Sequence, residues 1–132
     1  MAVSQITREL HYPIQQVWSV VTNLEDTSWR SDLARVEVLS ETTFVEYAKS
    51  GYATTFTVTA CEEPTSWAFR MENENMSGHW EGRFISSQSG TRVTFTESVT
   101  AKHWWMHPLV SGYLKRQQRG YLMDLVKKLD GK

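Results

Sequence analysis

Apolar and polar residues alternate with a period of two between about residue 34 and residue 101. Such alternation is typical of β-strands that bury one face and expose the other. In residues 52–61, for example, Tyr52, Phe56 and Val58 share one face while threonines occupy the other. The pattern breaks at four segments rich in turn residues: 50–51, 63–65, 75–78 and 88–90. Strands joined by such short turns pair as antiparallel neighbours, which predicts a meandering sheet.

The residues on either side of this region follow other patterns. Residues 2–10 predict an edge strand, and Pro13 then opens a helical spacing that runs to about residue 21. We expect a second short helix around residues 24–29, because Glu25 and Asp26 suit a helix N-terminus. Helical spacing returns from about residue 109 to residue 129, and Pro108 places the start of that helix near His107. The order predicts an α+β fold: seven strands, two short helices after the first strand and a long C-terminal helix.

Length and composition narrow the class of protein. The 132 residues fit a single domain, without internal repeats or linkers. With 14 Lys and Arg against 15 Asp and Glu, the chain has no strong field to attract nucleic acid or an anionic membrane. The lone Cys61 excludes an intrachain disulfide. Since no basic leader or apolar run of about 18 residues is present, we expect a cytoplasmic protein without stable membrane insertion.

Several short segments, none of them specific alone, occur in an order that resembles the helix-grip superfamily. That superfamily includes START lipid-transfer domains, plant pathogenesis-related allergens and polyketide cyclase/dehydrase-like proteins, the SRPBCC group. The segments are Pro13-Ile-Gln-Gln-Val-Trp18, Trp29, Pro64-x-x-Trp67, residues 80–84, residues 90–97 and residues 108–125. The resemblance implies a strongly bent seven-stranded sheet that grips the C-terminal helix around a cavity. Members carry lipids or hormones, cyclise polyketides, modify aromatic compounds or dock on proteins, so the fold alone does not select a function.

Aromatic residues are the main candidates for the wall of this cavity. The chain has six Trp, five Tyr and five Phe. Rings and one thioether share one face of three neighbouring predicted strands, at Trp67, Phe69, Met71, Trp80, Phe84 and Phe95. Any one of them suits ordinary core packing, but the set favours a cavity, because Gly78 and Gly82 would leave gaps between the rings. Further candidates for ligand contact are Trp29, Tyr47, Phe56, Tyr113, Gln117 and Tyr121. Tyr113 and Gln117 equally suit a solvated helix face.

Glu97 is the main candidate for chemistry. Strand parity places it on the same face as Val93 and Phe95, and a carboxylate on an apolar face needs a partner or its pKa rises. It could then anchor a ligand or act as a general acid or base. The alternative is a structural carboxylate that turns to water or pairs with a Lys or Arg. Either Glu46 or Tyr47 faces inward on its strand, and if Glu46 does, two carboxylates in one pocket would raise one pKa.

Metal and cofactor chemistry have little support. His103 and His107 have the spacing of a helical metal pair, but Pro108 disfavours helix there and no carboxylate lies nearby in sequence. The chain has no glycine-rich phosphate loop, Gly-x-Ser-x-Gly elbow or P-loop. We therefore expect no metal and no cofactor.

Three hypotheses for function follow. The first is binding of a small hydrophobic molecule, aromatic or lipid-like, between the sheet and the C-terminal helix. The second is a cofactor-free polyketide cyclase or dehydratase that uses Glu97 as acid or base with a tyrosine such as Tyr47 or Tyr113. The third is a protein-interaction module that uses the surface near Trp104 and Trp105. The sequence does not set the oligomeric state, and a homodimer stays open.

Overall fold

A computed structural model describes residues 1–131. Its first elements are β1 (Ala2–Leu10), α1 (Ile14–Thr22), β2 (Leu33–Val38), β3 (Thr43–Ala48) and β4 (Ala53–Glu62). They are followed by β5 (Ser66–Glu72), β6 (Met76–Ser87), β7 (Gly90–Ala101), the 3₁₀ turn η1 (Trp104–Met106) and α2 (His107–Leu129). The predicted α+β order of seven strands and a long C-terminal helix is confirmed.

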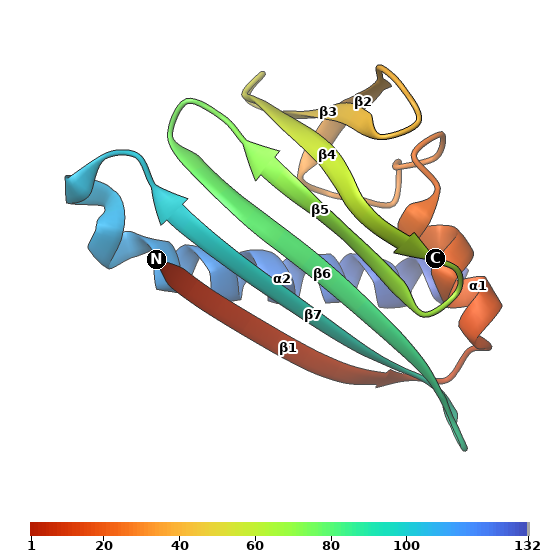
Figure 1. Cartoon of the computed structure of the whole chain (residues 1–132). Helices are drawn as coiled ribbons and strands as arrows, with labels where there is room; N and C mark the ends of the chain where they lie inside the picture. Colours follow the sequence, from red (N-terminus) through yellow and green to blue (C-terminus); the bar gives the residue numbers. More distant parts are fainter. Residues whose placement is uncertain (132) are drawn as a thin grey trace.

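All seven strands form one antiparallel sheet in the order β1-β7-β6-β5-β4-β3-β2. Consecutive strands pair from β2 to β7, and β1 closes the other edge by pairing with β7, with Ser4 opposite Glu97. Figure 1 shows α2 crossing one face of the sheet, behind β7 and β6 in this view, with α1 at the end near the C-terminus. The same view shows β2 and β3 curling away from the flat part of the sheet.

The core lies between the inner face of the sheet and α2. Alternate residues of β6 and β7 point inward, and Phe84, Val93 and Phe95 are almost fully buried. They pack with Leu122 and Leu125 of α2. On β3, β4 and β5 the inward positions carry rings that pack on one another, among them the stacked pair Phe44–Phe56 at 4.9 Å between centroids. The alternation read from the sequence therefore builds the buried face.

Two local elements differ from those expected. Residues 24–29 form turns instead of a second short helix, because side chains bind the nearby backbone: Asn23 accepts a hydrogen bond from the Glu25 amide and Asp26 accepts one from the Ser28 amide. The β5–β6 turn lies at residues 73–75 rather than 75–78, since Asn73 accepts hydrogen bonds from two following amides. β6 consequently begins at Met76, and Gly78 lies within the strand.

The C-terminal helix starts where Pro108 predicts. His107 is its first residue, and Pro108 occupies the first turn, where its missing amide hydrogen costs nothing. The preceding η1 turn carries Trp104 and Trp105.

Gly78 and Gly82 do not leave gaps between the rings, contrary to expectation. A Cβ on Gly82 would lie 2.6 Å from the Trp80 ring and 3.3 Å from the Phe95 ring. A Cβ on Gly78 would lie 2.5 Å from the carbonyl oxygen of Ser98. The two glycines thus allow close packing of a ring and of a neighbouring strand, and they do not create empty space.

The first prediction concerns Gly82. We expect Gly82→Ala to lower the free energy of unfolding by about 1–3 kcal/mol, because the Trp80 ring must move. Gly112→Ala is the matched control: Gly112 lies within α2 with open space around its Cα, so alanine should raise stability by about 0.5–1 kcal/mol. Urea unfolding of the two variants checks both signs. If Gly82→Ala is as stable as the wild type, the Trp80 ring can move without cost and the prediction is wrong.

Candidate functional site

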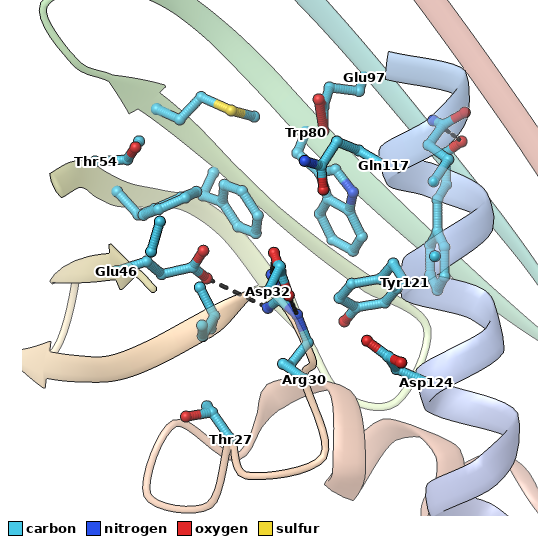
Figure 2. Close-up of a pocket in the computed structure, with 18 of the residues that line it drawn as sticks. Thr27, Arg30, Asp32, Glu46, Thr54, Trp80, Glu97, Gln117, Tyr121 and Asp124 are labelled. Atoms are coloured by element: carbon cyan, nitrogen blue, oxygen red, sulfur yellow. Dashed lines mark hydrogen bonds and ion pairs between the residues drawn. The ribbon is translucent and has the colours of Figure 1, made fainter. Parts of the chain in front are cut away.

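A cavity of about 330 Å³ lies between the inner face of β3–β7, the segment 24–33 and α2. Figure 2 shows its side chains converging from these three parts of the chain. Among its lining residues are ten of those proposed from the sequence for ligand contact: Trp29, Phe56, Trp67, Phe69, Met71, Trp80, Phe95, Tyr113, Gln117 and Tyr121. Glu97 also lines it. The structure therefore brings together most of the proposed residues.

Two of the proposed residues, Tyr47 and Phe84, do not line the cavity. Phe84 is completely buried and packs edge-on against Trp18 at 5.3 Å, deeper in the core. Tyr47 projects from the other face of β3, where the Arg35 guanidinium lies 3.8 Å from its ring centroid. Adjacent strand residues point to opposite faces, so Glu46 is the residue of this pair that faces inward. The tyrosine proposed to assist Glu97 cannot be Tyr47.

Arg30 is a site residue that the sequence did not reveal. Its Nε and Nη2 donate hydrogen bonds to the two carboxylate oxygens of Asp32 at 3.1 and 3.0 Å. Its Nη1 donates to Glu46 at 3.4 Å, and its guanidinium carbon lies 4.8 Å from the Tyr121 ring centroid. Only 13% of the Arg30 side chain is exposed. Because Arg30 lies in an irregular segment, no periodicity could have assigned it to the interior.

Glu97 stands on the opposite wall of the cavity from Arg30 and Glu46 (Figure 2). Within residues 1–131 its carboxylate has no hydrogen-bond or salt-bridge partner. Trp80 of β6 is directly across from it, and so is Ser4 of β1, whose hydroxyl donates to Gln118 at 2.7 Å. Within residues 1–131 the Ser4 hydroxyl is thus engaged with Gln118, and the indole of Trp80 makes no hydrogen bond to Glu97.

The electrostatics of the cavity follow from this arrangement. Burial raises the pKa of Glu97 to about 7, the nearby carboxylate of Glu46 adds to the rise, and Arg30 opposes it. Burial also raises the pKa of Glu46, against the opposing effect of Arg30. Burial and the charge of Glu97 raise the pKa of Tyr113. Two inward carboxylates thus share one cavity, and Glu97 can exchange a proton near neutral pH.

One stripe of α2 forms the third wall. Tyr113, Gln117, Gly120, Tyr121 and Asp124 recur at helical spacing and all line the cavity. Asp124 accepts hydrogen bonds from the amide and hydroxyl of Ser31 at 2.9 and 2.8 Å.

The segment 24–33 closes one end of the cavity. Besides the Ser31–Asp124 hydrogen bonds, the Trp29 ring packs edge-on against Tyr121 at 5.3 Å. The indole nitrogen of Trp29 is buried, and no hydrogen-bond acceptor contacts it in the described chain. These contacts hold the segment against α2.

The two histidines with metal-pair spacing lie away from the cavity. The Nε2 of His107 is 3.2 Å from the carbonyl oxygen of Ala101, and the His103 ring stacks on Trp105 at 5.7 Å. Within residues 1–131 no group of three or more His, Cys, Asp or Glu side chains is arranged to hold a metal ion.

Trp104 and Trp105 are both exposed, by 81% and 58% respectively. Neither packs beneath α2. Their role in contacting a partner stays a prediction. Over residues 1–131, no helix has the length and apolar character needed to cross a membrane.

A curved seven-stranded antiparallel sheet that holds a C-terminal helix across its inner face, with a cavity between them, is the helix-grip fold. A family described as polyketide cyclase / dehydrase and lipid transport matches residues 1–130, and this chain belongs to it. The resemblance stated from the sequence is thereby confirmed.

Solved structures show the same fold at low sequence identity. A START superfamily protein from Mycobacterium smegmatis has a TM-score of 0.86 and 11% identity, over 98% of this chain and 97% of that one. Protein MLL2253 from Mesorhizobium loti has a TM-score of 0.83 and 14% identity, over 99% and 98% of the two chains. An AHSA1-like protein from Aeromonas hydrophila has a TM-score of 0.74 and 20% identity, over 98% and 93%. Comparison with curated proteins finds no significant match.

The second prediction is the pH dependence of stability that Glu97 causes. Its folded-state pKa of about 7 exceeds the ordinary value of about 4.5, so the folded protein holds the proton more tightly than the unfolded chain. Glu97 does not lower the free energy of unfolding below pH 4.5, where it is protonated in both states. As the pH rises through 7, the cost of ionising the buried group lowers the free energy of unfolding by at most about 3 kcal/mol. Glutamine does not ionise, so Glu97→Gln lacks this pH-dependent loss. The free energy of unfolding of the variant, relative to wild type, should therefore rise between pH 5 and pH 8.

Urea unfolding at pH 5 and pH 8 measures that difference. Glu41→Gln, which removes an exposed carboxylate outside the cavity, is the matched control. An equal offset between Glu97→Gln and wild type at both pH values would contradict the raised pKa.

Proposed function

We propose that this protein binds a small hydrophobic molecule, aromatic or lipid-like, in the cavity between the sheet and α2. The observation that carries the proposal is the wall of rings on β3 to β7. The rings form a continuous series of close pairs, such as Phe69 stacked on Trp80 at 4.9 Å and Trp67 edge-on to Phe69 at 5.3 Å. These rings contact one another and border the cavity, so they offer a preformed apolar surface to a ligand.

The size of the cavity supports a compact ligand. Its volume of about 330 Å³ lies at the lower end of the range of roughly 300–1,000 Å³ typical of small-molecule sites. Polar and charged side chains, among them Arg30, Glu46, Glu97 and Gln117, also line the cavity and could orient a bound molecule. The family description, which includes lipid transport, agrees with binding as the basic activity.

The third prediction tests binding by filling the cavity. Gly120 lines the cavity, and a Cβ there would meet no atom within 4 Å. Gly120→Leu should therefore place a side chain in open space without loss of stability and weaken ligand binding about ten-fold or more, or 1.4 kcal/mol. The measurement is the fluorescence of N-phenyl-1-naphthylamine, an uncharged two-ring probe, titrated with protein.

Gly112→Leu is the matched control for this test. Gly112 lies on the same helix with equally open surroundings, but it does not line the cavity. It should bind the probe as wild type does. Native mass spectrometry of gently purified protein adds a search for a co-purified ligand. A wild-type protein that takes up neither the probe nor any member of a hydrophobic panel would overturn the proposal.

A second candidate function is acid–base catalysis by Glu97 without a cofactor. The unpaired carboxyl group with its pKa near 7 favours it, because such a group can accept and return one proton at neutral pH. A poly-β-ketone held against the rings would lose a proton from an acidic carbon to Glu97 and regain one on oxygen after ring closure. Tyr113, the other tyrosine proposed from the sequence to assist, lines the same cavity, which supports this role.

The fourth prediction separates catalysis from binding. If Glu97 transfers the proton, Glu97→Gln should lower kcat for a poly-β-ketone substrate by about 10²–10⁴-fold. Binding of N-phenyl-1-naphthylamine should be retained, because the glutamine has nearly the same shape. The rate should depend on pH with an inflection near the pKa of about 7. Full turnover by the Gln variant would rule out the acid–base role.

A further inference from the structure

The charged side chains around the cavity are strongly unbalanced. Four carboxylates line it, those of Asp32, Glu46, Glu97 and Asp124. Among the described residues that line it, Arg30 is the one guanidinium or ammonium group. The chain as a whole has a net charge of only −1, so this negative balance is a local property of the cavity.

The positive charge of Arg30 is already engaged by the protein. Each of its three nitrogens donates to a carboxylate oxygen, two of them to Asp32 and one to Glu46. Its planar face lies against Tyr121. A ligand carboxylate would have to compete with two fixed carboxylates for this guanidinium, and it would enter a region that is already negative.

Within residues 1–131, three of the four carboxylates have hydrogen-bond partners and Glu97 has none. Asp32 and Glu46 hold Arg30, while Asp124 accepts two hydrogen bonds from Ser31. Some of the other polar lining groups bind one another. The amide of Asn73, for example, accepts from the Tyr52 hydroxyl and donates to Thr54.

The groups that face Glu97 come from every element around it. Glu46 on β3 repels its negative charge, Arg30 in the segment 24–33 attracts it, and Tyr113 on α2 is affected by its charge in turn. The adjacent strands contribute the uncharged Ser4 and Trp80. The combined environment favours the arrival of a positive charge at this carboxylate, and aromatic rings nearby can stabilise a cation further.

We propose that the cavity selects hydrophobic amines, with the protonated nitrogen on the carboxylate of Glu97 and the apolar body against the ring wall, and disfavours carboxylic acids of the same shape. This inference rests on the proposed binding function and names its ligand class. An ammonium group supplies the donor that Glu97 lacks, and it offsets the local excess of negative charge.

The fifth prediction uses three probes with one shape and three charges. They are 2-(2-naphthyl)ethylamine, a cation, 2-(2-naphthyl)ethanol, which is neutral, and 2-naphthylacetate, an anion. Their affinities are measured at pH 8 by displacement of N-phenyl-1-naphthylamine. The amine should bind at least about ten-fold more tightly than the alcohol, and the acid should bind most weakly.

Glu97→Gln and pH identify the group responsible. The variant should lose most of the advantage of the amine over the alcohol, and the control Glu41→Gln should behave as wild type. In the wild type, lowering the pH from 8 to 6 should weaken the amine about ten-fold, because a proton and the ammonium compete for the same carboxylate. The alcohol should keep its affinity.

The possible results separate the selection of amines from the proposed binding of hydrophobic molecules on which it rests. Equal binding of the three probes, or strongest binding of the acid, overturns the selection of amines and leaves the cavity as a general hydrophobic site. An amine advantage that survives in Glu97→Gln overturns the role of Glu97. Failure of all three probes and of N-phenyl-1-naphthylamine to bind overturns the proposed function itself, and the inference with it.

Discussion

The helix α2 covers only part of the inner face of the sheet, and the position of the cavity depends on this constraint. One side of the helix packs closely on β1 and β7, through buried residues such as Leu114 and Leu122. The other side, with Gln117 and Tyr121, faces across an open space toward β3, β4 and β5 (Figure 2). Because the sheet is wider than one helix and curves around it, the helix cannot seal both halves. The rings of the uncovered half pack on one another, and the cavity is what remains.

The segment 24–33 covers this open half, and buried charges hold it there. The side chain of Arg30 is buried and contacts Glu46 on β3 and Tyr121 on α2. It therefore links the segment 24–33 to both the sheet and the helix. Removing either partner of such a buried pair costs far more than the pair contributes, since the remaining charge stays buried. The pair therefore specifies where the segment lies. It also fixes a second carboxylate, Glu46, opposite Glu97, and the charge of Glu46 raises the pKa of Glu97.

The sequence predicts what depends on regular periodicity. Alternation along β7 placed Glu97 on the buried face with Val93 and Phe95, because no bulge interrupts that pairing. It could not decide between Glu46 and Tyr47, since both suit a short strand and only the pairing with β4 sets the register. The turns at residues 24–29 depend on local hydrogen bonds, in which Asn23 and Asp26 bind nearby amides instead of a helix N-terminus. The position of Arg30 depends on contacts with distant elements, for which a single sequence gives no signal. The sequence predicts a gap between rings at Gly82, because it does not show that the Trp80 ring occupies the space next to this glycine.

Binding of an amine and acid–base catalysis make opposite demands on Glu97. A carboxylate that holds an ammonium group must stay ionised, and the ligand lowers its pKa by adding a positive neighbour. In the catalytic proposal Glu97 must take a proton from carbon and later return it, so its pKa must stay raised, which requires that the bound molecule bring no positive charge. For any given ligand, Glu97 can therefore either bind an ammonium group or act in acid–base catalysis, but not both. Within residues 1–131 the carboxylate of half-buried Glu97 has no hydrogen-bond partner, whereas the other charged groups of the cavity are paired. The charge of a bound molecule would therefore determine which of the two proposed uses this carboxylate could serve.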